Sequence, residues 1–325
     1  MDDYNRIEKP PTLYCIGEAL IDFIPAGETA DGTPLLAPMP GGATANTAVA
    51  AAKLGANVSF IGKVGEDGFG HMLKDGLQNY GVDTTYMSLT RTACTTLAFV
   101  TLSKDGERSF TFARKPGADM MLSEDDVPDG LFSAGDVLHF GSLGLIPGSL
   151  SRAAHAKAIL SAKSAGALLS FDPNLRFALW DDPAELKKAV LEYLPFADIV
   201  KISDDELDFI FGTKDEKAAA SVCFAQGAAL VFITRGKSGA AFYTPEYSAE
   251  AAGIPVTAVD TTGAGDAFNG AFLSRVIGKP ARECLDPEIL TETLRFANTA
   301  GSISVTRKGA MNGSPTEAEI LSFSL

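Results

Sequence analysis

The stretch AVDTTGAGDAFNGAFL (258–273) combines small residues with a carboxylate directly before an apolar segment. Four residues stand at the start of the helix that this segment predicts: Gly263, Ala264, Gly265 and Asp266. At such a position backbone N–H groups lack internal partners and the helix dipole is positive, and small residues let a phosphate approach closely. Asp266 could then accept a hydroxyl proton while the amides stabilise a transferring phosphoryl group. The residues alone equally allow a tight turn in which Asp266 caps the helix.

A second stretch, PMPGGATANTAVAAAKLG (38–55), also places glycines before a helical pattern. Gly41 and Gly42 precede the predicted helix, and Asn46 falls in its first turn. The glycines allow a sugar to approach the backbone, and the Asn46 amide can both donate and accept hydrogen bonds. The stretch therefore indicates either a binding site for a small polar molecule or a simple helix start with Asn46 facing solvent.

Two standard nucleotide-binding motifs fail in this sequence. GKS occurs at 236–238, but Val231 occupies the position of the first glycine of a Walker A loop. The dinucleotide fingerprint G-x-G-x-x-G, started at Gly263, reaches Phe268 instead of its third glycine. A hydride-transferring enzyme is therefore disfavoured.

The elements that must position these residues alternate between apolar strands and Ala-rich helices. The strand candidates are LYCIGEALIDFI, VSFIGKVG, VLHFG, ALLSFDPN, DIVKIS, ALVFITRG and IPVTAVD. The helix candidates include ANTAVAAAKLG, SRAAHAKAILSAKSAG and AFNGAFLSRV, and the first two end in glycine. This alternation predicts an α/β protein with a mostly parallel sheet covered by helices on both faces.

Polar residues follow several of the predicted strands. Because parallel strands present their carboxyl ends at one edge of a sheet, we expect binding residues to gather there. The candidates are Asp22, Asp172, Asn174, Ser203, Glu206, Thr234 and Gly236. They predict a site for a small polar substrate and a nucleotide.

One segment departs from the alternation. CTTLAFVTLSKDGERSFTFARK (94–115) reads as two strands around the turn KDGE (104–107), and Asp-Gly is a hairpin signal. We therefore predict one domain over 1–325, with a β lid formed by approximately 18–40 and 93–118. Uncovered strand edges and apolar surface on such a flap favour a homodimer.

Charge and composition exclude several classes of function. The chain of 325 residues has 27 Lys and Arg against 41 Asp and Glu, a net charge of −14, so we expect no nucleic-acid binding. No segment approaches the roughly 18 consecutive apolar residues of a membrane span, and the N-terminal sequence lacks a secretory pattern. The four cysteines are scattered. We expect reduced thiols, no membrane association and a cytoplasmic location.

The two glycine-containing stretches resemble the paired signatures of the ribokinase-like (PfkB) carbohydrate kinases, through GGATANTAVAAAKLGANVSFIGKVG and DTTGAGDAFNGAFL. The resemblance extends from IGEALIDF to VTRKGAMNGSPT, nearly the whole chain. It implies a three-layer α/β/α fold with a mostly parallel sheet and a small β-sheet lid. Within the family the sequence is most similar to the bacterial fructokinases, through FTFARKPGADMML, HFGSLGL, SFDPNLRFALW and FANTAGSISVTRKGA.

The resemblance implies a role for each matching residue. Asp266 would be the base that deprotonates the acceptor hydroxyl, and Gly263, Ala264 and Gly265 would form the anion hole. The implied sugar-binding residues are Asp22, Gly41, Gly42, Asn46 and the lid residue Arg114. The implied ATP-binding residues are Arg176, Ser203, Thr234, Gly236, Gly239, Gly265 and Asn298.

The resemblance also implies two kinds of metal ion. Glu206 matches the glutamate of the N-x-x-E motif, which organises Mg²⁺ through water, although Ser203 replaces the asparagine. The Ser203 hydroxyl can still bind a water molecule. A site for a monovalent cation, K⁺, is implied at a loop that binds mostly through backbone carbonyls: Asp260, Thr262, Ser304, Arg307 and Gly309.

The implied reaction is transfer of the γ-phosphate of MgATP to D-fructose, giving fructose 6-phosphate. Closure of the lid would exclude water and suppress ATP hydrolysis. Ribose and 2-keto-3-deoxygluconate remain alternative acceptors; for the latter, Arg114 fits, but Phe112 lacks the hydroxyl of a tyrosine. A sugar- or nucleotide-sensing protein without catalysis is the alternative from another class, and the presence of Asp266 argues against it.

Overall fold

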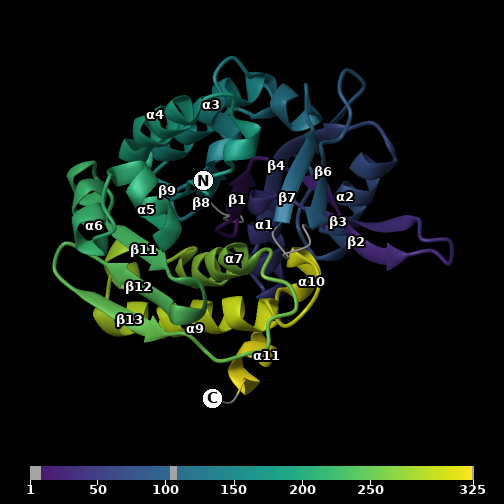
Figure 1. Cartoon of the computed structure of the whole chain (residues 1–325). Helices are drawn as coiled ribbons and strands as arrows, with labels where there is room; N and C mark the ends of the chain where they lie inside the picture. The colour runs from purple at the N-terminus through teal and green to yellow at the C-terminus, as the bar shows by residue number, and fades with distance from the viewer. Residues whose placement is uncertain (1–8, 103–107, 324–325) are drawn as a thin grey trace.

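The computed structural model describes residues 9–102 and 108–323, and within them the central sheet has nine strands (Figure 1). In spatial order the strands are β13 (Ser248–Ala252), β12 (Gly239–Tyr243), β11 (Leu230–Thr234), β10 (Ile199–Ser203), β9 (Leu168–Asp172), β8 (Val137–Gly141), β1 (Leu13–Ile16), β4 (Val58–Gly65) and β5 (Met87–Thr90). Neighbouring strands from β11 to β5 are parallel. β12 and β13 extend one edge as antiparallel strands. The predicted mostly parallel sheet is confirmed.

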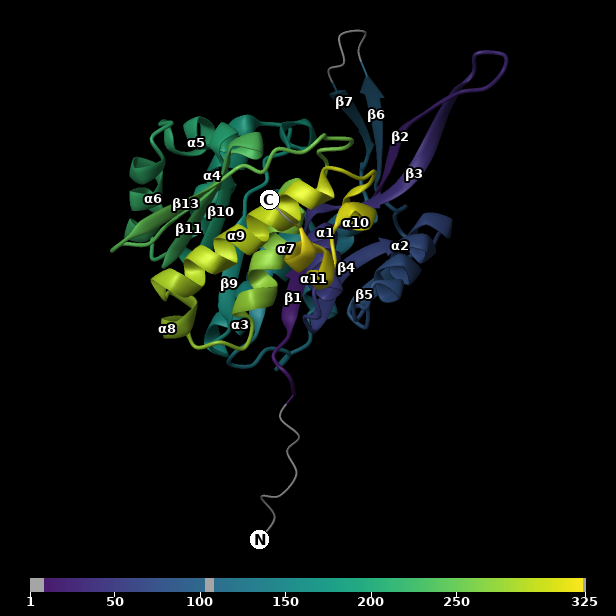
Figure 2. The same ribbon diagram turned by 90° about the horizontal axis from the view of Figure 1, so that it is seen from below.

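Helices cover both faces of this sheet and produce three layers (Figure 2). One face carries α1 (Ala43–Lys53), α2 (Gly68–Asn79), α7 (Ala264–Val276), α8 (Ala281–Cys284), α9 (Pro287–Ser304), α10 (Ala310–Gly313) and α11 (Glu317–Ser322). The other face carries α3 (Leu150–Ser164), α4 (Pro183–Tyr193), α5 (Asp204–Phe211) and α6 (Glu216–Ala225). Within the described residues, no helix is both long and apolar enough to cross a membrane.

The alternation of side chains along β1 divides the core into two clusters. Leu13 and Cys15 pack with the layer of α1, α7 and α9, whereas Tyr14 and Ile16 pack with the layer of α3 to α6. All four side chains are fully buried. A strand that is buried on both faces has a continuous apolar sequence, which explains why these strands could be recognised.

Two predicted strands differ in the structure. LYCIGEALIDFI forms two strands, because the chain leaves the central sheet at Gly17 and continues as β2 (Leu20–Glu28) of a separate sheet. The prediction of a strand at IPVTAVD (254–260) was wrong: these residues form an irregular connection between β13 and α7. Pro255 lacks the N–H that a strand interior requires, and Val259 is 53% exposed rather than buried in a sheet.

A small four-stranded sheet projects from the central body (Figure 2). Its described strands are, in spatial order, β3 (Pro34–Gly41), β2 (Leu20–Glu28), β6 (Leu97–Leu102) and β7 (Arg108–Ala113). They lie within the two ranges predicted for the lid except that β3 extends one residue further, to Gly41, while the predicted turn at 104–107 lies outside the described residues. β2 and β3 also connect β1 to α1, so the small sheet is directly continuous with the carboxyl end of a central strand.

Helices α1 and α7 pack closely, which brings their N-terminal ends together. A methyl group at Gly270 of α7 would lie 2.5 Å from the Cβ of Ala50 in α1. The Ala-rich sequence of α1 and this glycine therefore permit an unusually close helix contact. Asn46 near the start of α1 and Asp266 near the start of α7 consequently meet, although they are 220 residues apart in the sequence.

Candidate active site

A cavity of about 750 Å³ opens at the carboxyl ends of the parallel strands, beside the small sheet. Segments from both halves of the chain contribute to it. The predicted residues that line it are Asp22, Gly42, Asn46, Asn174, Arg176, Ser203, Glu206, Thr234, Gly236, Thr262, Gly263, Ala264, Gly265 and Asp266. The structure therefore brings the predicted base, anion hole, sugar side and nucleotide side to one cavity.

The remaining predicted residues stand around the cavity and do not form its lining. They are Gly41, Arg114, Asp172, Gly239, Asn298, Asp260, Ser304, Arg307 and Gly309. Their contacts are described below, because several of them hold the loops that carry lining residues.

Asp266 is a buried carboxylate in the first turn of α7. Its Oδ2 accepts a hydrogen bond of 2.8 Å from Nδ2 of Asn46. Burial raises the pKa of Asp266 to about 6; the Asn46 hydrogen bond opposes this rise, Asp172 adds to it, and Lys201 and Arg176 oppose it. A carboxylate with a raised pKa is a stronger base than an ordinary aspartate and is still ionised at neutral pH.

The N-terminus of α7 has the geometry of an anion site. Gly263 is its N-cap residue and has a φ of 81°, a left-handed conformation that glycine adopts without strain. The intrahelical hydrogen bonds begin with Ala267 N–H donating to Gly263 O at 2.8 Å. Helix geometry leaves the amides before Ala267 without intrahelical acceptors, and these amides border the cavity beside Asp266.

Asp22 enters the cavity from the small sheet. It was predicted at the end of a strand of the parallel sheet, but it lies within β2, opposite Met39 of β3. Partial burial raises the pKa of Asp22 to about 6, and the nearby Arg176 opposes this rise. A methyl group at Gly41 would lie 2.2 Å from Asp22 Oδ2, so Gly41 leaves room for this carboxylate in its present position.

Glu18 is a lining residue that the sequence reasoning missed. It is buried in the connection between β1 and β2, and its Oε1 accepts a 2.7 Å hydrogen bond from the N–H of Ala43 at the start of α1. Burial raises its pKa to about 7. Its signal in the sequence was an acidic residue within the apolar run IGEALIDF.

Glu206 connects two loops at the nucleotide side. Its Oε1 accepts from Leu175 N–H at 2.6 Å and its Oε2 from Ser203 N–H at 2.9 Å, and Ser203 is the N-cap of α5 in a capping box. Both oxygens are thereby fixed at the cavity edge, and each retains a lone pair. Among the described residues no group of three or more His, Cys, Asp or Glu side chains could hold a metal ion. The donor set fits Mg²⁺ held mainly by phosphates and water.

Arg114 lies directly after β7 rather than on that strand. Its guanidinium is buried and donates to Asp119 Oδ2, with Nε at 2.8 Å, and to the carbonyl of Leu143 at 3.2 Å. Leu143 lines the cavity, so Arg114 lies behind this part of the wall in the present conformation. The prediction that Arg114 reaches over a sugar is not tested by this arrangement.

The loops predicted to bind a monovalent cation lie side by side. Asp260 accepts from Thr262 N–H at 3.0 Å and from Gly309 N–H at 3.1 Å, so its carboxylate joins the two loops. The Ser304 hydroxyl donates to Gly301 O, and the Arg307 side chain pairs with Glu319. The prediction that these loops bind a monovalent cation, mostly through backbone carbonyls, stays a prediction.

Asn298 and Gly239 both support the segment around β13. Asn298 Nδ2 on α9 donates to Ala252 O at 2.9 Å. A methyl group at Gly239 would lie 2.0 Å from Ala251 O, so the close approach of the two backbones requires glycine. Their predicted contacts with ATP remain predictions.

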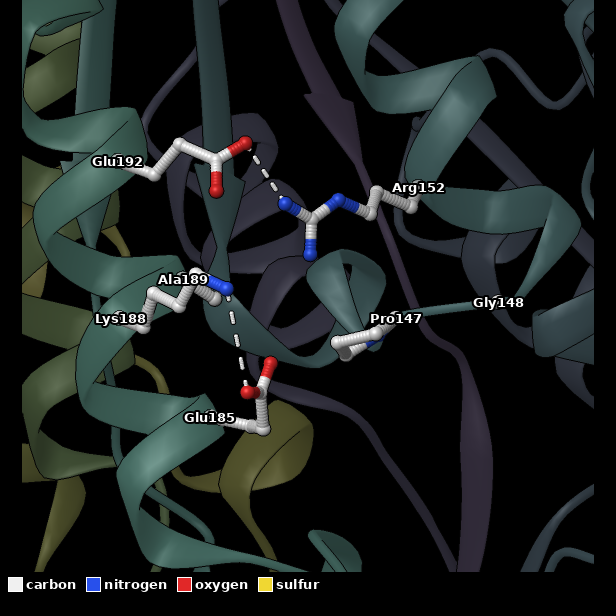
Figure 3. Close-up of a pocket in the computed structure, with 7 residues that line it drawn as sticks. All are labelled: Pro147, Gly148, Arg152, Glu185, Lys188, Ala189 and Glu192. Atoms are coloured by element: carbon white, nitrogen blue, oxygen red, sulfur yellow. Dashed lines mark hydrogen bonds and ion pairs between the residues drawn. The ribbon is translucent and has the colours of Figure 1, made fainter.

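A second, smaller cavity of about 230 Å³ lies between α3 and α4 (Figure 3). Its charged side chains pair with one another: Arg152 with Glu192 at 2.7 Å, and Lys188 with Glu185 at 4.0 Å. Because these cations are already neutralised, the cavity lacks the charge imbalance of the larger site. The larger cavity is therefore the candidate active site.

Comparison with known proteins identifies the family. The family model described as pfkB family carbohydrate kinase matches residues 11–317. The chain belongs to this family. As a pfkB family member, the protein is an ATP-dependent sugar kinase, which confirms the predicted class of enzyme and sets aside the alternative of a non-catalytic sensor.

Individual members of the pfkB family resemble the whole chain. Fructokinase-1 of Zea mays is 43% identical over 312 residues, which are 95% of this chain and 96% of the Zea mays protein. The structure of the Vibrio cholerae O395 fructokinase with fructose, ADP and a calcium ion has a TM-score of 0.88 at 36% identity, covering 96% of this chain and 98% of that chain. These similarities confirm the predicted ribokinase-like fold.

A pfkB family structure with another acceptor is also similar. Aminoimidazole riboside kinase from Salmonella enterica, with aminoimidazole riboside and an ATP analogue, has a TM-score of 0.84 at 31% identity. It covers 96% of this chain and 100% of that chain. The fold alone therefore does not determine the acceptor, which must be argued from sequence similarity and from the site.

Proposed function

We propose that this protein transfers the γ-phosphoryl group of ATP to D-fructose and produces fructose 6-phosphate. The observation that carries the proposal is the juxtaposition of Asp266, the N-terminus of α7 and Asp22 around one cavity. The choice of fructose is supported by the full-length similarity to proteins named fructokinase.

The chemistry follows from the positions of Asp266 and the α7 amides. Asp266 takes the proton of the acceptor hydroxyl, whose oxygen then forms a bond to the γ-phosphorus, while the bond to the leaving oxygen of ADP breaks. The amides of Gly263, Ala264 and Gly265 stabilise the charge that spreads over the transferring group. Asn46 donates to Oδ2 of Asp266 and thereby fixes the orientation of the carboxylate that receives the proton.

The sugar side is formed by the small sheet and the start of α1. Asp22 accepts hydrogen bonds from ring hydroxyls, and Gly41, Gly42 and Asn46 shape the adjoining wall. Closure of the small sheet over the sugar, with Arg114 moving with it, excludes water and limits wasteful hydrolysis of ATP.

The nucleotide side lies along the ends of β9, β10 and β11. Arg176, Thr234 and Gly236 line the cavity there and would contact the phosphates and ribose. Asn298 and Gly239 would act at the adenine end. Mg²⁺ accompanies ATP as part of the substrate, and Glu206 orients its water ligands. K⁺ would be bound by the carbonyls of the two loops joined by Asp260.

We also propose that the chain acts as one domain over 1–325, that it forms a homodimer through the small sheet, and that it works in the cytoplasm.

The acceptor is tested by measuring kcat/KM with ATP for fructose, ribose, 2-keto-3-deoxygluconate, aminoimidazole riboside and fructose 6-phosphate. We expect fructose to have the highest value. Fructose 6-phosphate is expected to be a poor acceptor because its C6 oxygen, the one that receives the phosphoryl group from ATP, already carries a phosphate and has no proton for Asp266 to remove. A higher kcat/KM for any other sugar would overturn the choice of fructose and leave the kinase assignment intact.

A further inference from the structure

Lys201 is a buried cation in the wall of the active site. It lies in the middle of β10, between the buried residues Val200 and Ile202, and is only 7% exposed. Lysine is among the residues least often buried, and a sequence such as DIVKIS would form the same strand with an apolar residue there. The presence of an ammonium group at this position therefore needs an explanation.

The ammonium group of Lys201 belongs to a hydrogen-bonded network beneath α7. Its Nζ is 3.1 Å from Oδ2 of Asp172 at the end of β9, and the same oxygen accepts from Nδ2 of Asn269 at 2.7 Å. Asn269 is one helical turn after Asp266. Lys201 lines the cavity, whereas Asp172 and Asn269 do not. The cation therefore faces the cavity, and its partner carboxylate stands behind it.

The Lys201 ammonium lies directly against the anion hole. A methyl group at Gly265 would be 2.9 Å from Nζ, so the glycine leaves the space that the ammonium occupies. A cation beside a helix N-terminus is opposed by the helix dipole and costs stability in the absence of an anion. This arrangement is expected where a polyanion binds, because the cation and the dipole then attract the same ligand.

Three carboxylates keep Lys201 charged in spite of its burial. Burial alone would lower its pKa, but Asp172, Glu206 and Asp266 raise it, and the pKa of Lys201 is raised overall. In return, Lys201 lowers the pKa of Asp266. The ammonium therefore lies close enough to act electrostatically on two parts of the site: the amides at the N-terminus of α7 and the carboxylate of Asp266.

We infer that Lys201 is a positioning residue for phosphoryl transfer, whose fixed charge strengthens the anion hole of α7 and holds Asp266 in its ionised form. This inference rests on the proposed kinase reaction. Lys201 keeps its proton throughout: the hydroxyl proton moves to Asp266, the new oxygen–phosphorus bond forms, and ADP leaves with the electron pair of the broken bond.

The charged groups that face Asp266 come from several elements. They are Asp172 from β9, Lys201 from β10, Arg176 from the loop after β9 and Asp22 from β2. Asp172 raises the pKa of Asp266, and Lys201 and Arg176 lower it. The two members of the buried ion pair therefore act on the base in opposite directions, which allows a structural role to be separated from an electrostatic one.

The matched variants Lys201→Met and Asp172→Asn test the inference, because each breaks the same ion pair. The pH dependence of kcat/KM reports the free enzyme, and its acid limb follows ionisation of Asp266. We expect the acid limb to move to higher pH in Lys201→Met and to lower pH in Asp172→Asn. We also expect kcat at pH 8 to fall roughly 10–100-fold in Lys201→Met and less in Asp172→Asn. Displacements in the same direction, or none, would overturn the inference.

The double variant Lys201→Met/Asp172→Asn distinguishes loss of activity through misfolding from loss of the Lys201 charge. It removes both buried charges together, and the amide oxygen introduced at position 172 can still accept a hydrogen bond from Asn269. If Lys201 only holds the fold together, this variant recovers kcat close to wild type. We expect it to fold, by circular dichroism, and to keep the low kcat of Lys201→Met, whereas Lys201→Arg recovers part of it. A wild-type protein inactive with every sugar would instead contradict the proposed function.

Discussion

Asp266 is held in an environment in which its ionised form is less stable than it would be in water. It is buried, its pKa is raised to about 6 chiefly by that burial, and one hydrogen bond from Asn46 partly compensates the ionised state. An active-site group of this kind reduces the stability of the fold in exchange for reactivity.

The pH dependence of stability follows from this pKa. The folded pKa of Asp266 lies above its ordinary value of 3.8, so the native state binds the proton more tightly and loses stability as pH rises from about 4 to 6. Asp266→Asn mimics the protonated form. We expect it to raise the free energy of unfolding by about 2–3 kcal/mol at pH 8, with a much smaller gain at pH 4.5, measured by urea denaturation.

Asp181→Asn is the matched control for this prediction, because the Asp181 side chain is fully exposed. It should change stability little at either pH. An Asp266→Asn protein that is less stable than wild type at pH 8 would show that the environment of the carboxylate has been misjudged.

The site residues that belong to a local sequence motif could be predicted from the sequence. Isolated charged residues that reach the site only through the tertiary fold could not. Asp266, Asn46 and Glu206 belong to recognisable local patterns, and all three line the cavity. Glu18, in the connection after β1, and Lys201, within β10, are single charged residues among apolar neighbours, and only the tertiary structure shows that they reach the site. Their sequence signal is the isolated charge itself.

At the scale of elements, the junction between β3 and α1 positions the sugar side. Gly42 has a φ of 105° and is the N-cap of α1, and a methyl group there would lie 2.4 Å from the backbone oxygen of Glu18. Gly27 in β2 has a similar φ of 101°, but no atom lies within 4 Å of the corresponding position. A substitution at Gly27 would therefore cause backbone strain alone, whereas a substitution at Gly42 would cause the same strain and also a clash with the backbone of Glu18.

Gly42→Ala should consequently destabilise the protein more than Gly27→Ala. We expect a loss of about 1 kcal/mol for Gly27→Ala from backbone strain alone, and at least about 2 kcal/mol more for Gly42→Ala. The latter should also lower kcat/KM, because it displaces the helix start that carries Asn46. Thermal unfolding and steady-state kinetics check both points; equal losses in the two variants would contradict the packing argument.

The elements themselves were predictable where burial on both faces imposes a continuous apolar sequence, as in β4 and β8. IPVTAVD had a similar composition, yet it crosses the edge of the sheet as a connection because Pro255 interrupts strand hydrogen bonding and Val259 remains exposed. The apolar pattern also could not predict that LYCIGEALIDFI is divided between two sheets, because apolar residues occur on both sides of Gly17. Local sequence does not reveal which sheet a strand joins.

At the scale of the whole molecule, the small sheet leaves apolar side chains exposed. Leu35 and Leu36 on the edge strand β3 are each 43% exposed, and adjacent residues of a strand point to opposite faces. Both faces of this sheet therefore present an apolar side chain near an edge that no other strand of the described residues pairs with, which supports the proposed dimer.

Light scattering after gel filtration should give twice the 34.0 kDa mass of one chain. We expect Leu36→Lys to shift the protein toward monomer. The matched control Leu160→Lys changes a leucine on α3 that is 57% exposed and far from the small sheet in sequence, and it should remain dimeric. A wild-type monomer, or equal effects of the two substitutions, would contradict the assignment of the interface.

The central claim is that Asp266 is the base of an ATP-dependent fructose kinase. Its most direct test is the kcat of Asp266→Asn with saturating ATP, Mg²⁺ and D-fructose, followed by formation of fructose 6-phosphate, in a protein shown to be folded by circular dichroism. If Asp266 is the base, kcat decreases roughly 10²–10⁴-fold, with a much smaller change in KM. Turnover close to that of the wild type would contradict it.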